Sequence, residues 1–314
     1  MLFIKKNFNC PKKLLQAYGD SDICNRNENQ DNYLIMCHKN NETKAVFLKD
    51  QKKHTQIIND WNKEYIRIAV ADGMGGHAHG RQISEKLIQE LIKLEVQKTP
   101  DQMRKQILDL NIKLYDQYLP HNERSPGTTL ILADIEVKTG KGVMINVGDC
   151  RAYILNKKPF MFNNWYIKQI TYDQTDAEYS YRDGEMEKKD YMAHKNSNNN
   201  RIVQAIGFGS MGIIKDDNGR KPYRPDKNLR IDIESDLVSE LKSHADSFYF
   251  QIKKNQILMI SSDGLWSGIS NGQWYFDKNI SELNQDLVSH IIKEGLSKNA
   301  NDNITVILCG FKTD

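Results

Sequence analysis

A strand, a glycine-rich loop and the start of a helix follow one another in the stretch Val70-Ala71-Asp72-Gly73-Met74-Gly75-Gly76-His77-Ala78-His79-Gly80. Residues 65–70 alternate as a half-buried strand does, which places Asp72 at the strand's end. The glycines let another group approach the main chain closely. A carboxylate beside free backbone groups and a helix start is suited to hold a hard cation or an anion. Taken alone, the stretch fits a solvated glycine turn equally well, so its meaning depends on the rest of the chain.

The composition is that of a globular protein with little net charge. The chain has 314 residues, of which 39% are hydrophobic, and a formal net charge of +3. Its mean hydropathy is −0.66, which predicts polar loops around an adequate core. We find neither a linker nor an internal repeat, so we predict a single domain over residues 1–314. The near-neutral charge argues against nucleic acid as a partner.

Cysteine use and hydropathy indicate a reducing compartment. The cysteines are odd in number, dispersed and never in C-x-x-C spacing, which also argues against a structural zinc site: Cys10, Cys24, Cys37, Cys150 and Cys309. No apolar run approaches the roughly 18 residues of a membrane span. We therefore expect a cytoplasmic protein, and delivery into a host cell by a specialised secretion system is compatible with the same sequence.

Periodic patterns predict the order of the elements. Strands are expected at 32–37, 66–70, 256–262 and 304–308, and as consecutive antiparallel strands at 130–137, 143–147 and 151–155, followed by 165–170. Helices are expected at 83–94 and 103–118, as an antiparallel pair on a sheet, and at 280–292 with Gly295 as C-cap. Residues 1–24 indicate an irregular lead-in or an edge strand.

Two stretches are polar and poorly periodic. Residues 38–63 indicate a hairpin excursion or insertion, and residues 172–230 are interrupted only by short apolar pieces. Loops this long inside a compact domain are usually lids or disordered excursions. We expect most of their length to be solvated loop.

Aspartates stand at the ends of several predicted strands. Asp72 and Asp263 each follow a strand, and Asp31 and Asp302 each precede one. Because the start of one antiparallel strand and the end of its neighbour lie at the same sheet edge, these carboxylates are expected to meet. Like charges held close together repel, and divalent cations remove that repulsion. Ligands that are all oxygen favour Mg²⁺ or Mn²⁺.

Two such ions in one site would support phosphoryl transfer. A pair of ions acidifies a water and stabilises the attacking and leaving oxygens. Arg26, five residues before Asp31, is placed to bind a phosphate with its planar guanidinium. His77 and His79 have the spacing of a metal-binding pair, but the hard oxygen surroundings favour other roles for them.

Six short motifs occur in an order that is specific when taken together. They are Arg26-x-x-Asn29-Gln30-Asp31, Asp72-Gly73-Met74-Gly75-Gly76-His77, Gly127-Thr128-Thr129, Val147-Gly148-Asp149-Cys150-Arg151, Ser262-Asp263-Gly264-Leu265-Trp266 and Asp302-Asn303-Ile304-Thr305. This order resembles the metal-dependent serine/threonine phosphatases of the protein phosphatase 2C family, and the bacterial members most. The resemblance covers residues 26–307.

The resemblance implies a fold, a reaction and a set of roles. The fold is α+β, an α-β-β-α four-layer sandwich of two antiparallel sheets flanked by helices. The reaction is hydrolysis of phosphoserine or phosphothreonine in phosphoprotein substrates by a water held in a binuclear Mn²⁺ or Mg²⁺ centre. By the resemblance, Asp72 corresponds to the ligand that bridges both ions, and the Gly73 carbonyl binds one of them. Asp263, Asp302 and Asp31 correspond to further ligands. Arg26 corresponds to the phosphate-binding arginine, and Asp149 to a ligand of a weak third ion. Residues 172–204 correspond to the family's variable flap.

Some positions depart from the family pattern. Gln30 removes one charge from the metal surroundings, and Ser267 stands where many members have a second aspartate, which puts the third ion in question. Met74 stands where some members have a histidine proposed as the acid for the leaving group. Cys150 replaces the more usual serine, and as a small buried residue it is expected to be tolerated rather than nucleophilic.

The sequence supports a monomeric phosphoprotein phosphatase and leaves two alternatives open. One is a pseudophosphatase that acts as a regulatory binding module, which Ser267 and Met74 allow and which the complete set of core aspartates opposes. The other is a different two-metal hydrolase, such as a nuclease, which the near-neutral charge disfavours.

Overall fold

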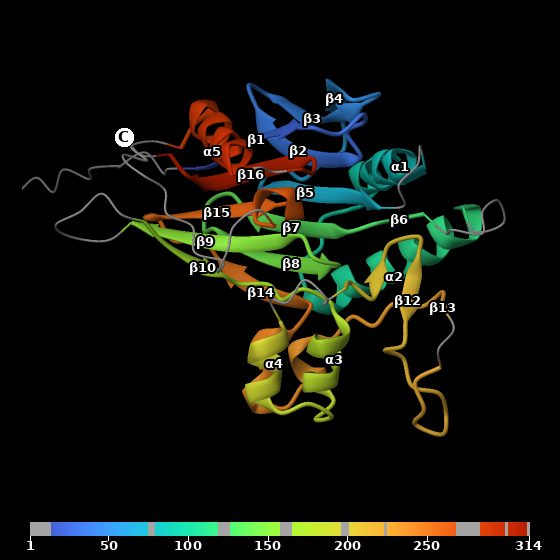
Figure 1. The fold of residues 1–314 in the computed structure, drawn as a ribbon. Coiled ribbons are helices and arrows are strands. Elements are labelled where there is room, and N and C mark those ends of the chain that lie inside the picture. The colour runs from blue at the N-terminus through green and yellow to red at the C-terminus, as the bar shows by residue number, and fades with distance from the viewer. Residues whose placement is uncertain are drawn as a thin grey trace, which may run out of the picture.

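Two packed β-sheets form the centre of the molecule, with helices on both outer faces (Figure 1). The computed structural model describes residues 14–74, 79–118, 126–157, 165–195, 201–222, 225–267, 283–298 and 301–312. None of the helices in these ranges is both long and apolar enough to cross a membrane.

The larger sheet carries the strand that leads into the glycine-rich stretch. It is eight-stranded, with the order β14-β8-β7-β5-β2-β3-β4, and β6 pairs with the end of β5. Its strands are β2 (Asp31–Lys39), β3 (Glu42–Lys49), β4 (Lys52–Ile58), β5 (Tyr65–Met74), β6 (Gly127–Thr128), β7 (Leu130–Glu136), β8 (Lys141–Val147) and β14 (Ser247–Gln251). Residues 38–63 thus form a hairpin that extends this sheet.

The second sheet brings the two ends of the described chain together. It is five-stranded, with the order β1-β16-β15-β9-β10, and all its pairings are antiparallel. Its strands are β1 (Leu15–Asp22), β9 (Arg151–Lys157), β10 (Trp165–Gln169), β15 (Gln256–Ser261) and β16 (Ile304–Phe311). The early part of the chain therefore supplies an edge strand, one of the two alternatives predicted.

The helices cover the outer faces of the sheets because the apolar side of each long helix packs on the apolar face of a sheet. The helices are α1 (His79–Lys93), α2 (Pro100–Tyr118), α3 (Asp176–Arg182), α4 (Lys188–His194) and α5 (Gln285–Ser297), with short 3₁₀ turns η2 (Glu234–Asp236), η3 (Ser239–His244) and η4 (Asp263–Leu265). A small sheet joins β11 (Gln204–Ala205), β12 (Gly209–Met211) and β13 (Pro225–Asp226). In Figure 1, α3 and α4 project from one side of the sandwich, below β14.

Separate hydrophobic clusters define the layers. One joins α1 and α2 to the larger sheet, through residues such as Leu87, Ile107 and Leu132. The next lies between the sheets, and the last lies under α5, which packs on the five-stranded sheet. The α+β four-layer sandwich that the resemblance implies is confirmed.

The strands at 143–147 and 151–155 are not neighbours, contrary to the sequence prediction. β8 pairs with β7 and β14 in the larger sheet, whereas β9 pairs with β10 and β15 in the other. The chain crosses between the sheets at Gly148, whose φ of +98° favours glycine and where a Cβ would lie 2.7 Å from Thr129 Cγ2. This crossing places Asp149 at the end of the sandwich.

Gly295 does not end the last helix. It lies inside α5, and Lys298 takes the C-cap position. A Cβ at Gly295 would lie 3.0 Å from Ile304 Cδ1 and 3.1 Å from Leu265 Cδ1. The glycine is there because α5 packs closely on β16, which a helix pattern alone does not distinguish from a cap.

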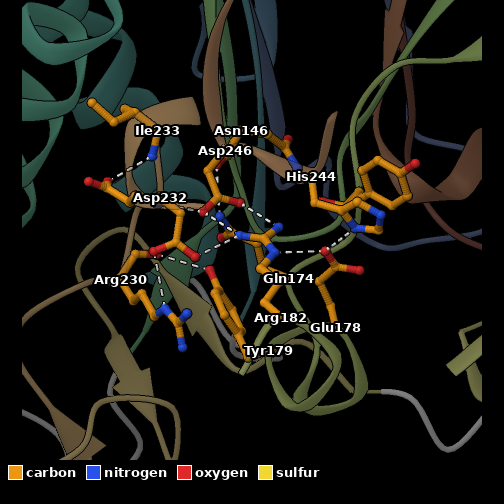
Figure 2. A network of polar contacts seen from close by, with 12 residues as sticks. Asn146, Gln174, Glu178, Tyr179, Arg182, Arg230, Asp232, Ile233, His244 and Asp246 are labelled. Atoms are coloured by element: carbon orange, nitrogen blue, oxygen red, sulfur yellow. Dashed lines mark hydrogen bonds and ion pairs between the residues drawn. The ribbon is translucent and has the colours of Figure 1, made fainter. Parts of the chain in front are cut away.

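The described parts of the stretch 172–230, residues 172–195, 201–222 and 225–230, contain more regular structure than the expected solvated loop. Figure 2 shows Arg182, at the end of α3, surrounded by carboxylates, one from α3 itself and two from a later segment. Its guanidinium contacts Glu178 Oε1 at 2.7 Å, Asp246 Oδ2 at 2.8 Å and Asp232 Oδ2 at 3.2 Å. The Arg182 side chain is fully buried. The pairs with Asp232 and Asp246 attach α3, the helix at the start of the flap, to the segment that leads into β14.

We predict that replacing Arg182 with methionine destabilises the protein. The change leaves Asp246 and Glu178 buried without their cation, which typically costs about 3–5 kcal/mol. Urea unfolding measures the free energy, with the exposed Arg220→Met as control, expected within about 0.5 kcal/mol of the parent. A loss for Arg182→Met no larger than for the control would show that the ion pairs do not hold the flap.

Candidate metal centre

Antiparallel pairing sets two of the predicted aspartates side by side. Asp31 at the start of β2 is the register partner of Asp72 near the end of β5. Asp31 is 3% exposed, and its Oδ2 accepts hydrogen bonds from Ser262 Oγ and Thr305 Oγ1, each at 2.7 Å. Ser262 directly follows β15 and Thr305 lies in β16, so both hydroxyls come from the five-stranded sheet. Asp31 therefore lies where the two sheets meet.

A close backbone approach brings in the other two aspartates. Gly264 follows Asp263, and a Cβ at Gly264 would lie 2.1 Å from the carbonyl oxygen of Asn303. Ser262 N also donates to Thr305 O, and Thr305 N donates to Ser262 Oγ. The end of β15 and the start of β16 are thus in direct contact. Because Asp263 and Asp302 stand at these two strand ends, the contact brings them close together.

The glycine-rich stretch packs against the loop before β2. Gly73 N donates to Gln30 O at 3.2 Å, and a Cβ at Gly73 would lie 2.3 Å from the Gly80 carbonyl oxygen. Only glycine fits between these backbones. The first turn of α1 is therefore held directly against Asp72 and Gly73, while residues 75–78 lie outside the described ranges.

Arg26 lies at the rim of the site and contacts one of the aspartates. Its Nη2 donates to Asp302 Oδ2 at 2.6 Å, and its Nε donates to Asn301 O at 2.9 Å. The two side chains are 52% and 36% exposed, so the ion pair is of the solvent-screened kind that contributes about 0–1 kcal/mol. A phosphate or a cation can displace such a pair.

Several contacts fix the loop that carries Arg26. The Asn303 side chain accepts from Gln30 N at 2.8 Å and donates to Ile23 O and Glu28 O. Arg81 in α1 binds the Glu28 carboxylate at 2.6 Å. The loop is thereby attached both to the start of β16 and to the first turn of α1.

Burial and like charge raise the pKa values of the central carboxyls. For Asp72 burial is the main cause, followed by Asp31 and Asp263, and its pKa lies well above the usual range. Burial raises the pKa of Asp31 to about 7 although the Ser262 and Thr305 hydrogen bonds lower it. Burial and the neighbouring Asp302 raise the pKa of Asp263. These carboxyls lose part of their charge in the absence of a compensating cation.

The donor set fits a hard divalent cation. The carboxylates are all oxygen donors, and the buried Asp263 Oδ1 has no hydrogen-bond partner. In the described part of the chain, no three His, Cys, Asp or Glu side chains are arranged to ligate one ion. Asp302 is instead turned to Arg26, and Asp31 to its hydroxyl donors. The residue types and their electrostatics suit Mg²⁺ or Mn²⁺, and side-chain rotation is needed to bind it.

Asp149 belongs to the same electrostatic group. Its pKa is raised well above the usual range by burial first and then by Asp263 and Asp173. Arg151, two residues on, pairs with Asp173 at 2.6 Å, and its guanidinium lies 3.3 Å from the centroid of the Trp266 ring. Asp149 therefore lies within electrostatic range of Asp263.

The remaining positions singled out in the sequence take various places. Ser267 is exposed, and its amide donates to Asp263 O at 2.8 Å. Cys150 is buried, contacts Thr129 Oγ1 at 3.0 Å, and has a pKa raised by burial, so it is an inert thiol. His77 lies outside the described ranges, and His79 contacts Gln82 at 3.3 Å. Met74 is the last residue of β5.

Sequence reasoning assigned no positioning role to the residues that hold these side chains in place. They are Ser262, Thr305, Asn303, Arg81, Glu28 and the Arg151–Asp173 pair. Asn303 and Thr305 were readable in principle, since they directly follow Asp302 in a strand start. The others have partners far away in the sequence, and no local pattern identifies them.

We predict that Gly264→Ala disrupts the site. The new Cβ meets backbone rather than a flexible side chain, so the β15 and β16 ends must separate, at a cost of about 3 kcal/mol. Gly184→Ala is the control, because nothing lies within 4 Å and only its φ of +73° adds about 1 kcal/mol of strain. Urea unfolding and Mn²⁺ titration measure both variants. Equal stability and equal Mn²⁺ affinity in the two would contradict the packing described.

Comparisons with known proteins find similar sequences and folds over most of the chain. No family profile matches the chain. A serine/threonine phosphatase of Listeria monocytogenes strain EGD-e is 26% identical over 281 residues, covering 86% of this chain and 90% of the relative. That of strain F2365 is 25% identical over 286 residues, with the same coverage.

Solved structures share the fold over nearly the whole chain. A bacterial serine phosphatase superposes with a TM-score of 0.61 at 21% identity, covering 96% of this chain and 99% of its own. The Staphylococcus aureus phosphatase Stp1 gives a TM-score of 0.61 at 20% identity, with 95% and 96% coverage. The Mycobacterium tuberculosis phosphatase PstP gives 0.56 at 18% identity, with 96% and 100% coverage.

Proposed function

We propose that the chain is a metal-dependent serine/threonine phosphatase of the protein phosphatase 2C type and that it hydrolyses phosphoserine and phosphothreonine in proteins; the similarity to the Listeria phosphatases and the shared fold support this. The observation that carries the proposal is the register pairing of Asp31 with Asp72, with Asp263 close enough to raise both pKa values. This is the acidic end of a sandwich shared with phosphatases of known structure.

Asp31, Asp72, Asp263, Asp302 and the Gly73 carbonyl are the groups that would hold two divalent cations, Mn²⁺ or Mg²⁺. When bound, two such ions polarise the phosphoryl group and lower the pKa of water so that it attacks at neutral pH. Asp149 is the residue for a third, weaker ion. The chain's own contribution is to hold these carboxyls close together, with the Ser262 and Thr305 hydroxyls orienting Asp31 and favouring its ionised form.

Arg26 supplies the phosphate contact. Its planar guanidinium suits two phosphate oxygens at once. In the structure it binds Asp302, so substrate binding transfers Arg26 from the carboxylate to the phosphate. That transfer frees Asp302 for a cation. Met74 has no proton to donate, so the leaving alkoxide takes its proton from water or from another group.

We also propose the domain organisation, the oligomeric state and the compartment of the protein from its similarity to these phosphatases. Residues 1–314 act as one catalytic domain with the flap at 172–204 and the hairpin at 38–63 beside it. The chain acts as a monomer on phosphoprotein substrates in a reducing compartment. The near-neutral net charge of +3 supports protein rather than nucleic acid as the substrate.

We predict metal-dependent turnover that requires Asp72. Purified protein is expected to hydrolyse para-nitrophenyl phosphate and a phosphothreonine peptide with Mn²⁺ or Mg²⁺, and to lose activity with excess chelator. Asp72→Asn removes a charge from the centre and is expected to lower kcat/KM about 10³-fold, whereas Asp109→Asn, exposed on α2, is expected to have no effect.

Either of two results would contradict the proposal. Retained turnover in Asp72→Asn would show that the acidic centre is not the active site. Absence of turnover in folded, metal-binding protein would favour the pseudophosphatase, in which the same fold acts as a regulatory binding module.

A further inference from the structure

The hairpin of β3 and β4 ends in a turn that contacts the loop of residues 23–30, which carries Arg26. The two residues of the turn are Asp50 and Gln51. The Gln51 side chain extends from the turn to the loop, where its Oε1 accepts a hydrogen bond from Asn29 N at 2.9 Å. The hairpin that widens the larger sheet is therefore also in direct contact with the 23–30 loop.

Asn29 is a buried residue near the end of the 23–30 loop, with 6% of its surface exposed. Its side chain accepts from Asp31 N at 3.1 Å and donates to Ser21 Oγ at 2.8 Å. Among the residues that the structure describes, Gln51 supplies the one acceptor for the Asn29 main-chain amide. Because a buried donor without an acceptor is costly, this hydrogen bond helps to fix the loop.

The turn is itself attached to α1. Asp50 N donates to Glu85 Oε1 at 3.0 Å, and Arg81 Nη1 contacts the same carboxylate oxygen at 3.0 Å. Arg81 Nε in turn binds Glu28 Oε1 in the loop at 2.6 Å. The turn, the start of α1 and the 23–30 loop thus form one connected set of contacts, which gives the turn a fixed position from which to hold the loop.

The backbone of the turn is one that glutamine adopts at a cost. Asp50 and Gln51 have φ of +48° and +61°, in the left-handed region. Two-residue hairpin turns of this kind usually carry glycine, asparagine or aspartate. Asn40 and Asn41, in the turn between β2 and β3, follow that preference at φ of +53° and +64°. The contact with the loop gives a physical reason for Gln51, because glycine has no acceptor and asparagine is one methylene shorter.

The two ends of the 23–30 loop are held to different degrees. Asp31, which follows the loop, lies in β2 and is bound by two hydroxyls of the other sheet. The Arg26 side chain is more than half exposed, and its ion pair with Asp302 is screened by solvent. A change in the loop therefore displaces Arg26 more than Asp31. A guanidinium binds two phosphate oxygens only in the right orientation, so phosphate affinity is sensitive to such a displacement.

We propose that Gln51 is a positioning residue for phosphate binding: by accepting from Asn29 N, it holds the 23–30 loop so that Arg26 is directed at the phosphate. Gln51 acts through Asn29 and not on the substrate itself. The inference rests on the proposed phosphatase function and adds to it a role for the hairpin at residues 38–63.

Two replacements of Gln51 test the proposal with para-nitrophenyl phosphate at saturating Mn²⁺. Gln51→Met keeps the length of the side chain and removes the acceptor, whereas Gln51→Gly removes the acceptor and the left-handed strain together. Each is expected to raise KM about 5-fold, the effect of one lost hydrogen bond, with kcat within about 2-fold of the parent. Partial unfolding would instead lower the apparent kcat and leave KM unchanged.

Matched replacements on the same strands show whether the effect belongs to Gln51. Asn41→Gly changes the equivalent left-handed position of the β2–β3 turn, and Gln56→Met changes an exposed glutamine on β4. Both are expected to keep the KM of the parent. Urea unfolding is expected to give Gln51→Gly a midpoint close to that of the parent, because relief of strain offsets the lost hydrogen bond.

The comparison of KM values decides the proposal. An unchanged KM in both Gln51 variants would overturn it. So would an equal rise of KM in Asn41→Gly or Gln56→Met, because the effect would then belong to the hairpin in general and not to the contact with Asn29.

Inorganic phosphate separates this proposal from the phosphatase activity. If the wild type shows no turnover, the proposed function fails, and the dissociation constant for inorganic phosphate is measured by calorimetry at saturating Mg²⁺. Weaker phosphate binding in Gln51→Met than in both the wild type and Gln56→Met would keep the positioning role without the activity. Equal affinity in all three proteins, or no phosphate binding by the wild type, would overturn the positioning role as well.

Discussion

Repulsion among Asp31, Asp72 and Asp263 is the constraint on which the rest of the structure depends. These carboxyls are partly or fully buried; Asp263 raises the pKa of both Asp31 and Asp72, and Asp31 raises that of Asp72. No fold places such groups together at a gain in stability unless something compensates their charge. The surrounding groups compensate only in part, since two hydroxyls bind Asp31 and Arg26 binds Asp302. A bound divalent cation would remove the remaining cost.

The two sheets make that arrangement possible because their strand ends meet in one place. Asp31 and Asp72 are register partners in neighbouring antiparallel strands. Asp263 and Asp302 stand at the ends of β15 and β16, which pair with each other. Gly73 and Gly264 allow main chains to approach at distances that a Cβ would prevent. The packing that closes this end of the sandwich therefore also holds these carboxylates together.

Much of this was readable from the sequence, and the reasons for the rest are physical. Strand patterns and the positions of Asp31, Asp72, Asp263 and Asp302 sufficed to predict that the carboxylates converge, because strand ends alternate in direction. The change of sheet at Gly148 was not predicted, since a tight turn between two strands looks the same whether or not the strands pair. The order of the flap was missed because Arg182 finds its carboxylates 50 and 64 residues away, at Asp232 and Asp246. Ion pairs of that sequence separation leave no local pattern.

Calorimetric titration of Mn²⁺ into the folded protein tests the central claim most directly. The account predicts saturable binding of two ions per chain, with most of the heat lost in Asp72→Asn, and a rise in the free energy of unfolding with Mn²⁺ concentration in the parent alone. Folded protein that binds no Mn²⁺ or Mg²⁺, or that binds them equally well after Asp72→Asn, would contradict it.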